Sequence, residues 1–151
     1  IQLAMTNKRR FFMKASVIYW SGTGNTEAMA NEIAAKLKEL GADTKLVSVE
    51  EASLDDAKEA ELLALGCPAM GAEELEEDYF RPYFDSIKDI IKDKKVAIFG
   101  SYEWNSGEWM DLWKNECADS GISVVDALIA YDHPDAEALA KCRELAEKLM
   151  N

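Results

Sequence analysis

The stretch Tyr19-Trp20-Ser21-Gly22-Thr23-Gly24-Asn25-Thr26 sets the interpretation of the whole chain, because an apolar run breaks there into six small or polar residues. The residues before the break, 15–20, are mostly β-branched or aromatic and predict a buried strand. Residues 27–40 predict a helix. The start of a helix leaves backbone N–H groups unpaired and carries the positive end of the helix dipole. The loop 21–26 is therefore predicted to bind an anion, and phosphate is the expected ligand.

The chemistry of this loop favours a single phosphomonoester. Its two glycines let the backbone fold around the guest without side-chain clashes. Hydroxyl and amide donors come from Ser21, Thr23, Asn25 and Thr26. The loop has no lysine, whereas a triphosphate site of the G-x-x-x-x-G-K-[ST] kind uses one at the β- and γ-phosphates. The alternative is a polar turn with an ordinary helix cap, which such residues also form.

The composition is that of one acidic domain. The 151 residues are 48% hydrophobic, which is enough for a single core. A formal net charge of −12 argues against nucleic acid, because phosphate contacts need a basic surface. Cys67, Cys117 and Cys142 form no C-x-x-C pair, so we expect reduced core thiols, no metal site and a cytoplasmic protein. No apolar run is long enough for a transmembrane helix, so no membrane is expected.

Residues 1–12 do not fit the pattern of the rest. They carry three basic residues and no acidic ones, which leaves 14 basic and 29 acidic residues after them. We expect them to be an N-terminal extension or a cloning remnant, outside a domain that spans residues 13–151.

From Met13 onward, strand and helix patterns alternate. The predicted strands are 15–20, 44–49, 61–66, 95–100 and 123–130. Apolar residues at helical spacing follow the first, third, fourth and fifth of them, at 29–40, 80–91, 109–117 and 139–149; an acidic connector, 51–59, lies between the second and third. Propensity favours a helix for the run 61–66, but its brevity and its Gly-Cys-Pro ending favour a strand. The alternation predicts an α/β fold with a parallel sheet and helices on both faces.

Three strand ends carry distinctive loops, 21–26, 67–74 and 101–107. Ligands of open parallel sheets bind outside the carboxyl ends of the strands, so we expect these loops to meet. Met70 and Trp104 would then lie on either side of a planar ring. Such residues are more often part of the core. These two stand in polar, glycine-containing loops, which favours the ligand role.

Taken in order, these motifs resemble the short-chain flavodoxins of anaerobic bacteria. The resemblance is carried by 18–26, by 66–71 with Glu73-Glu74 after it, and by Phe99-Gly100-Ser101-Tyr102-x-Trp104. It covers the chain from Met13 onward, and the last strand lacks the insertion of long-chain relatives. It implies a flavodoxin-like, doubly wound, five-stranded parallel sheet in the order 2-1-3-4-5.

The resemblance also implies a function. The chain would be a low-potential electron carrier, not an enzyme, with non-covalently bound FMN that alternates between neutral semiquinone and anionic hydroquinone. The cofactor-binding residues it implies are Ser21, Gly22, Thr23, Gly24, Asn25 and Thr26 for the 5′-phosphate, Pro68, Ala69, Met70, Gly71, Ala72 and Glu73 in the second loop, and Ser101, Tyr102, Glu103 and Trp104 in the third.

The roles within the second and third loops follow from the same resemblance. Met70 covers the inner face of the isoalloxazine and Trp104 the outer face. The Gly71-Ala72 peptide turns its carbonyl toward flavin N5 on reduction, and Glu73 accepts a hydrogen bond from N3. Main-chain N–H groups of 101–103 approach the N1 and C2 edge.

The chain departs from the family at two positions beside the outer tryptophan. Relatives commonly have glycine there, and this chain has Glu103 and Asn105. A positive φ at position 103 would strain a glutamate. Its carboxylate would also repel the anionic reduced flavin.

Acidic residues flank the second and third loops, at Glu73, Glu74, Glu76, Glu77, Asp78, Glu108 and Asp111. They are either an ordinary solvated face or a docking surface for basic redox partners near the flavin edge. We expect a monomer. An FMN-dependent reductase on the same fold is the alternative function, and His133 is given no catalytic role.

Overall fold

The computed structural model describes residues 13–151; residues 1–12, predicted to be an extension, lie outside that part. The elements are β1 (Lys14–Tyr19), α2 (Asn25–Glu39), β2 (Asp43–Ser48), α3 (Leu54–Lys58), β3 (Leu62–Gly66), α4 (Phe80–Ile87), β4 (Lys95–Tyr102), α5 (Glu108–Asp119), β5 (Val124–Tyr131) and α6 (Ala136–Met150). The strands pair in parallel in the order β2-β1-β3-β4-β5. The predicted α/β fold and strand order are confirmed.

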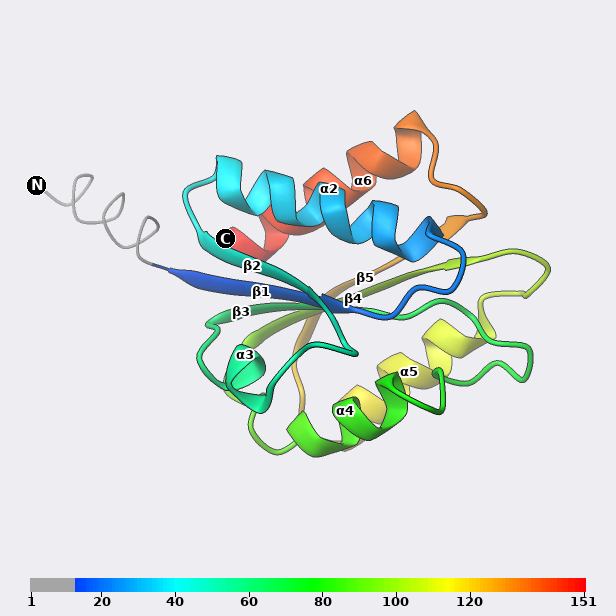
Figure 1. Cartoon of the computed structure of the whole chain (residues 1–151), viewed down its shortest axis with the longest axis horizontal. Coiled ribbons are helices and arrows are strands. Elements are labelled where there is room, and N and C mark those ends of the chain that lie inside the picture. Colours follow the sequence, from blue (N-terminus) through cyan, green and yellow to red (C-terminus); the bar gives the residue numbers. More distant parts are fainter. Residues whose placement is uncertain (1–12) are drawn as a thin grey trace, which may run out of the picture.

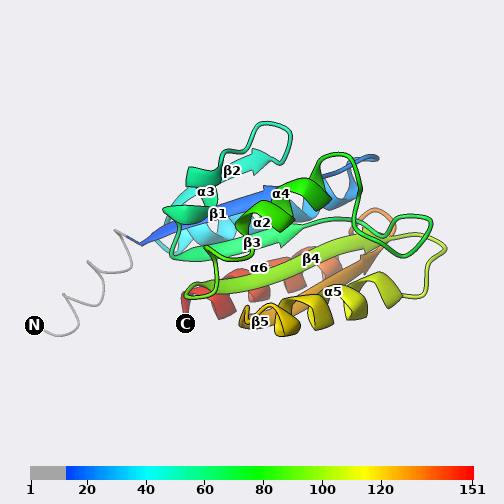
Figure 2. The ribbon, with the colours of Figure 1, turned by 90° about the horizontal axis from the view of Figure 1, so that it is seen from below.

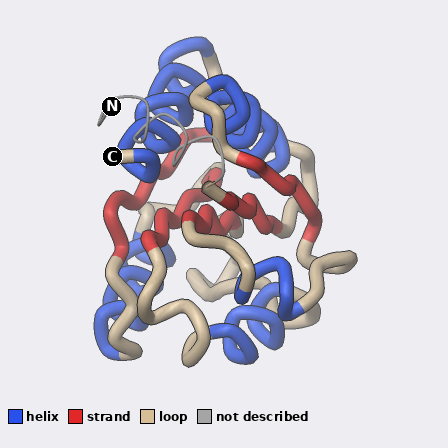
Figure 3. Tube along the Cα trace, turned by 90° about the vertical axis from the view of Figure 1, so that its left-hand side faces the viewer, coloured by secondary structure: helices blue, strands red, loops and turns tan. Residues whose placement is uncertain are grey.

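Helices cover both faces of the sheet (Figure 1). One layer is formed by α2 and α6, which lie side by side, and the other by α3, α4 and α5 (Figures 2 and 3). Each layer packs against its own hydrophobic core.

The central strand β3 shows why a leucine-rich run becomes a strand here. Leu62 and Ala64 pack into the core beneath α2 and α6, whereas Leu63 and Leu65 pack into the core beneath α3, α4 and α5. All five residues of β3 are buried. Burial on alternate faces overrides the helix propensity of the individual residues.

Two boundaries differ from the prediction in ways that matter for the site. β4 continues through Ser101 and Tyr102, which were predicted to start a loop, because β5 pairs with β4 as far as Tyr131. The helix α2 begins at Asn25, two residues earlier than predicted, so the end of the first loop forms its first turn. The stripe at 80–91 is buried as predicted, although α4 itself ends at Ile87.

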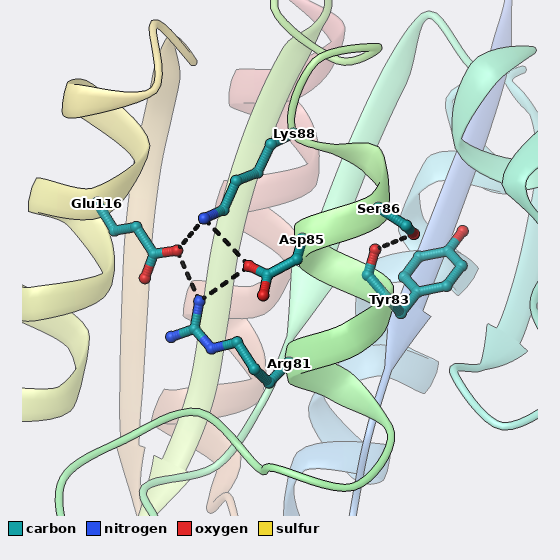
Figure 4. A network of polar contacts seen from close by, with 6 residues as sticks. All are labelled: Arg81, Tyr83, Asp85, Ser86, Lys88 and Glu116. Carbon is teal, nitrogen blue, oxygen red and sulfur yellow. Dashed lines mark hydrogen bonds and ion pairs between the residues drawn. The ribbon is translucent and has the colours of Figure 1, made fainter.

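A ring of four charges joins α4 to α5 (Figure 4). Glu116 Oε2 on α5 lies 2.6 Å from both Arg81 Nη1 and Lys88 Nζ, and Asp85 Oδ1 lies 3.3 and 3.1 Å from the same two groups. Burial alone would raise the pKa of Glu116, but the hydrogen bonds from the two cations outweigh it and hold the pKa below its usual value. The ring therefore ties the two helices together.

Candidate functional site

The three predicted loops meet at the carboxyl ends of β1, β3 and β4, on the right of Figure 1. They enclose a cleft of about 250 Å³. The cleft is lined by Trp20, Gly22, Thr23 and Asn25 from the first loop, Pro68, Ala69, Met70 and Gly71 from the second, and Ser101, Glu103, Trp104 and Asn105 at and after the end of β4. Ten of the sixteen predicted cofactor-binding residues are among these twelve.

The first loop is held open by its own contacts. Ser21 Oγ accepts hydrogen bonds from the N–H of Gly24 at 3.1 Å and of Glu27 at 3.2 Å, so this serine caps the loop and does not line the cleft. Gly24 precedes α2 with φ +94°, a conformation that L side chains rarely adopt. A Cβ on Gly22 would lie 2.9 Å from the Trp20 ring. The backbone path therefore requires glycine at position 24, whereas Gly22 lies close against the Trp20 side chain.

Five backbone N–H groups of this loop have no acceptor among the described residues. They belong to Ser21, Gly22, Thr23, Asn25 and Thr26. They precede or open α2, where the helix dipole adds positive potential. These free donors fit the predicted anion cradle, whereas the alternative of a capped polar turn accounts only for the donors that Ser21 satisfies.

Thr26 and Ser101 join the first loop to β4. Thr26 is 1% exposed, and its Oγ1 lies 2.7 Å from Ser101 Oγ and accepts from the Ser101 N–H at 3.3 Å. The Thr26 hydroxyl therefore does not line the cleft, and instead links α2 to β4.

The second loop forms a tight turn from Met70 to Glu73. The Glu73 N–H donates to the Met70 carbonyl at 2.9 Å. Neither central residue, Gly71 or Ala72, has a positive φ, which excludes turn types I′, II and II′. Glu73 itself has φ +56°, so the strained position in this region is 73. Glu103, where the sequence raised the question of strain, does not have a positive φ.

Glu73 connects the second loop to α5. Its Oε2 accepts from the Trp109 N–H at 2.7 Å, in the first turn of that helix. Its Oε1 has no donor among the described residues. The carboxylate is thus fixed by one oxygen while the other stays free to accept.

Met70 and Trp104 both belong to the cleft and not to the core. Trp104 is 75% exposed, Met70 is half-buried, and a Cβ on Gly71 would lie 3.9 Å from the Trp104 ring. Asn105 Nδ2 donates to the Met70 carbonyl at 3.1 Å. The two side chains predicted to face a planar ring are therefore held at one cleft.

Sequence reasoning missed two lining residues, Trp20 and Asn105. Trp20 was assigned to the buried strand, but β1 ends at Tyr19 and the indole is only half-buried. Asn105 was noted only as a departure from glycine. Conversely, Tyr102 lies outside the cleft lining, and its ring packs on Trp109 and Tyr131 at centroid distances of 5.9 and 5.6 Å.

Glu76 does not belong to the acidic surface. It is 5% exposed, and its carboxylate accepts three hydrogen bonds at 2.8 Å from the N–H groups of Asp78, Tyr79 and Phe80. Three donors at the start of α4 compensate the burial of the charge. Its neighbours Glu74, Glu77 and Asp78 are exposed. The predicted acidic face is therefore real but lacks this member.

The cysteines are buried and free, as predicted. Desolvation raises the pKa of the Cys67, Cys117 and Cys142 thiols to about 12, so none is a ready nucleophile. Within residues 13–151 no cluster of acidic, histidine or cysteine side chains could hold a metal ion. No helix in this part is long and apolar enough to cross a bilayer.

Comparisons with known proteins agree with this geometry. Residues 17–145 match the sequence profile of the family described as Flavodoxin. The chain is 49% identical to a flavodoxin of Megasphaera elsdenii over 131 residues, 87% of this chain and 94% of the relative. It is 43% identical to a flavodoxin of Clostridium beijerinckii over 136 residues, 89% of this chain and 98% of the relative. The solution structure of two-electron reduced Megasphaera elsdenii flavodoxin matches with a TM-score of 0.82 at 46% identity, over 90% of this chain and 98% of that one.

Proposed function

Because the chain belongs to the flavodoxin family, in its short-chain group, it is an FMN-binding electron carrier and not an enzyme, and we propose that the cleft between its three loops holds the FMN. One observation carries this proposal: a lysine-free cradle of N–H groups lies at the same cleft as Met70 and Trp104. Two relatives above 40% identity are flavodoxins, and nothing in them favours the reductase alternative.

The first loop fits the phosphate of FMN. Free N–H groups at Gly22, Thr23, Asn25 and Thr26 are the donors that an anion requires, and they are neutral, as a single phosphomonoester allows. Ser21 shapes this cradle from outside the cleft, through its bonds to Gly24 and Glu27.

Met70 and Trp104 fit the two faces of the ring. A thioether and an indole both pack well on a flat aromatic system. When bound, FMN supplies one-electron chemistry. The two side chains exclude water from it, which disfavours added negative charge and lowers the reduction potential. The hydrogen bond from Asn105 to the Met70 carbonyl links the two loops that carry these side chains and so fixes their separation.

The polar edge of the ring is assigned to two loops. Glu73 has Oε1 free to accept from flavin N3, while Oε2 stays on Trp109. The chain after β4 would approach N1 and the C2 carbonyl, which places the exposed Glu103 carboxylate near the site of developing charge. The Gly71-Ala72 peptide is proposed as the group that responds to N5.

Flavodoxins exchange electrons with redox partner proteins, and we propose that partners of this chain are basic and dock at the cleft rim. The support is the exposed carboxylates of Glu74, Glu77, Asp78, Glu103 and Glu108 around the loops, together with the net charge of −12. The free thiols support a cytoplasmic location. We further propose that the chain acts as a monomer.

Titration of the apoprotein with FMN and stepwise reduction test this function. We expect one FMN per chain, two resolved one-electron stages in the absorbance spectrum, and no steady-state oxidation of NADH or NADPH. Failure to bind FMN would contradict the carrier, and sustained nicotinamide turnover would instead establish the reductase. Partner docking is tested separately, because electron transfer to a basic acceptor should slow as ionic strength rises.

A further inference from the structure

The chain's one histidine lies beside the proposed phosphate cradle. His133 Nδ1 is 3.2 Å from Asn25 Oδ1, across 108 residues of sequence. Asn25 opens α2 and lines the cleft, whereas His133 is exposed in the loop between β5 and α6. The contact therefore joins the proposed phosphate cradle to the loop between β5 and α6, which is not one of the three loops described above.

The loop that carries His133 is fixed on both sides. Before it, the Asp132 N–H donates to the Tyr102 carbonyl at 2.7 Å, and Asp132 has φ +55°. After it, Pro134 is buried, and Asp135 Oδ1 caps α6 by accepting from the Ala138 N–H at 2.8 Å. These contacts fix the loop independently of the imidazole, and the fixed loop places His133 beside Asn25.

In the structure the Asn25 amide presents Oδ1 to His133. An amide oxygen can only accept, so in this orientation Nδ1 of His133 is the donor. With Oδ1 used in this way, the Nδ2 group of Asn25 has no acceptor among residues 13–151 and remains a donor for a guest. Loss of the Nδ1 proton would favour the flipped amide, which would turn an oxygen toward an anion.

We propose that His133 is a positioning residue for the FMN phosphate: its Nδ1–H orients the Asn25 amide, and its protonation makes phosphate binding pH-dependent. The inference rests on the proposed placement of FMN. A histidine changes charge between about pH 5 and 8, and an imidazolium keeps Nδ1 protonated while adding positive charge beside the phosphate. The loop 21–26 holds no lysine or arginine, so this charge has no duplicate in it.

The charged groups around His133 are mainly acidic. Asp132 and Asp135 flank it, Glu27 lies in the first turn of α2, and Glu137 lies in the first turn of α6, where Lys141 is its partner at 3.9 Å. The Glu27 carboxylate already accepts from the Tyr19 hydroxyl at 2.8 Å. These carboxylates accommodate an imidazolium, and a bound phosphate would add a further negative charge on the cleft side.

NMR of the single histidine tests the proposal on the unaltered chain. Its imidazole C–H resonances are followed against pH in the apoprotein, with FMN, and with riboflavin, which has the ring but no phosphate. We expect FMN to raise the titration midpoint of His133 by about 0.5–1 pH unit and riboflavin to move it by less than about 0.2, because a phosphate favours the charged imidazole. Equal midpoints in all three states would overturn the proposal.

His133→Gln, which keeps a neutral amide but does not titrate, supplies the affinity test. Relative to the unaltered chain, we expect its FMN dissociation constant to be about 3- to 10-fold higher at pH 5.5 and within about 2-fold at pH 8.5, with riboflavin unaffected. Ionisation of the phosphate of free FMN is common to both titrations and cancels in the ratio. A ratio independent of pH overturns the role of His133 alone. Equal binding of FMN and riboflavin by the unaltered chain, or no binding of either, overturns the proposed phosphate site as well.

Discussion

The side-chain amide of Asn105 donates to the main-chain carbonyl of Met70 across 3.1 Å. This bond ties the loop that carries the exposed Trp104 to the turn that carries Met70, so the two walls of the cleft are not independent. Position 105 is one where the resemblance led us to expect glycine, and this chain uses the extra side chain as a brace.

Removing that brace should weaken FMN binding. For Asn105→Gly we expect a dissociation constant about 3- to 10-fold higher, since a typical hydrogen bond contributes about 1 kcal/mol and the loop gains freedom. Quenching of flavin fluorescence by the apoprotein measures it. Ser106→Gly is the matched control, because Ser106 is exposed in the same loop and makes no recorded side-chain bond within the described residues. Equal affinities of the two variants would refute the brace.

The carboxylate of Glu103 should lower the potential of the second one-electron reduction, in which the flavin gains negative charge. We expect Glu103→Gly to raise that potential by tens of millivolts, roughly the effect of one screened charge near the ring. Glu103→Gln separates charge from backbone freedom and should give most of the rise. Spectroscopic redox titration decides, and an unchanged or lower potential in both variants would dispose of the electrostatic role.

Gly24 of the first loop and Gly71 of the second loop differ in the backbone conformation that they adopt. Gly24 has φ +94°, so Gly24→Ala should reduce the free energy of unfolding by about 1–2 kcal/mol, the usual penalty for an L residue in that region. Gly71 lacks a positive φ, and its added Cβ would make an ordinary 3.9 Å contact with Trp104. Gly71→Ala should therefore stay within about 0.5 kcal/mol. Urea unfolding of both apoproteins compares them; an equal loss in the two variants would show that backbone conformation is not the cause.

The charge ring between α4 and α5 predicts a loss of stability in acid. The folded chain holds the pKa of Glu116 and of Asp85 below their usual 4.5 and 3.8, because hydrogen bonds from Arg81 and Lys88 outweigh desolvation. Groups with depressed pKa values stabilise the fold above the unfolded values, and that stability is lost as pH falls through the folded values. Maximal benefit is therefore expected above about pH 5 and a decline below about pH 4.5.

Glu116→Gln tests this directly. We expect it to lower the free energy of unfolding at pH 7 by about 1–2 kcal/mol, since a partly buried carboxylate with two partners is lost. The free energy of unfolding of this variant should also fall less steeply as the pH is lowered into the acid range. Glu137→Gln, which removes an exposed carboxylate 3.9 Å from Lys141, is the control and should change stability by less than about 0.5 kcal/mol. If both variants lose stability in acid as steeply as the unaltered chain does, the charge ring is not the cause of that loss.

The sequence predicted the alternation of elements and the meeting of three loops because both follow from local patterns. The run 61–66 was correctly assigned as a strand from its length and its ending, and the break after Tyr19 located the cradle. Strand order came from the family resemblance, since periodicity does not encode it.

What the sequence could not provide depends on contacts between distant residues. Glu76 was assigned to the acidic face because its neighbours are solvated, yet it is buried by three N–H donors at the start of α4. Asn105 and His133 act across 35 and 108 residues, and neither has a local signature. Nothing in the sequence indicated that the Ser21 hydroxyl oxygen accepts from the N–H groups of Gly24 and Glu27.

A crystal structure of the FMN-loaded protein tests the central claim most directly. The account predicts one flavin with its phosphate on the N–H groups of 22–26 and its ring between Met70 and Trp104. A flavin bound away from this cleft, or a ring that contacts neither side chain, would contradict it.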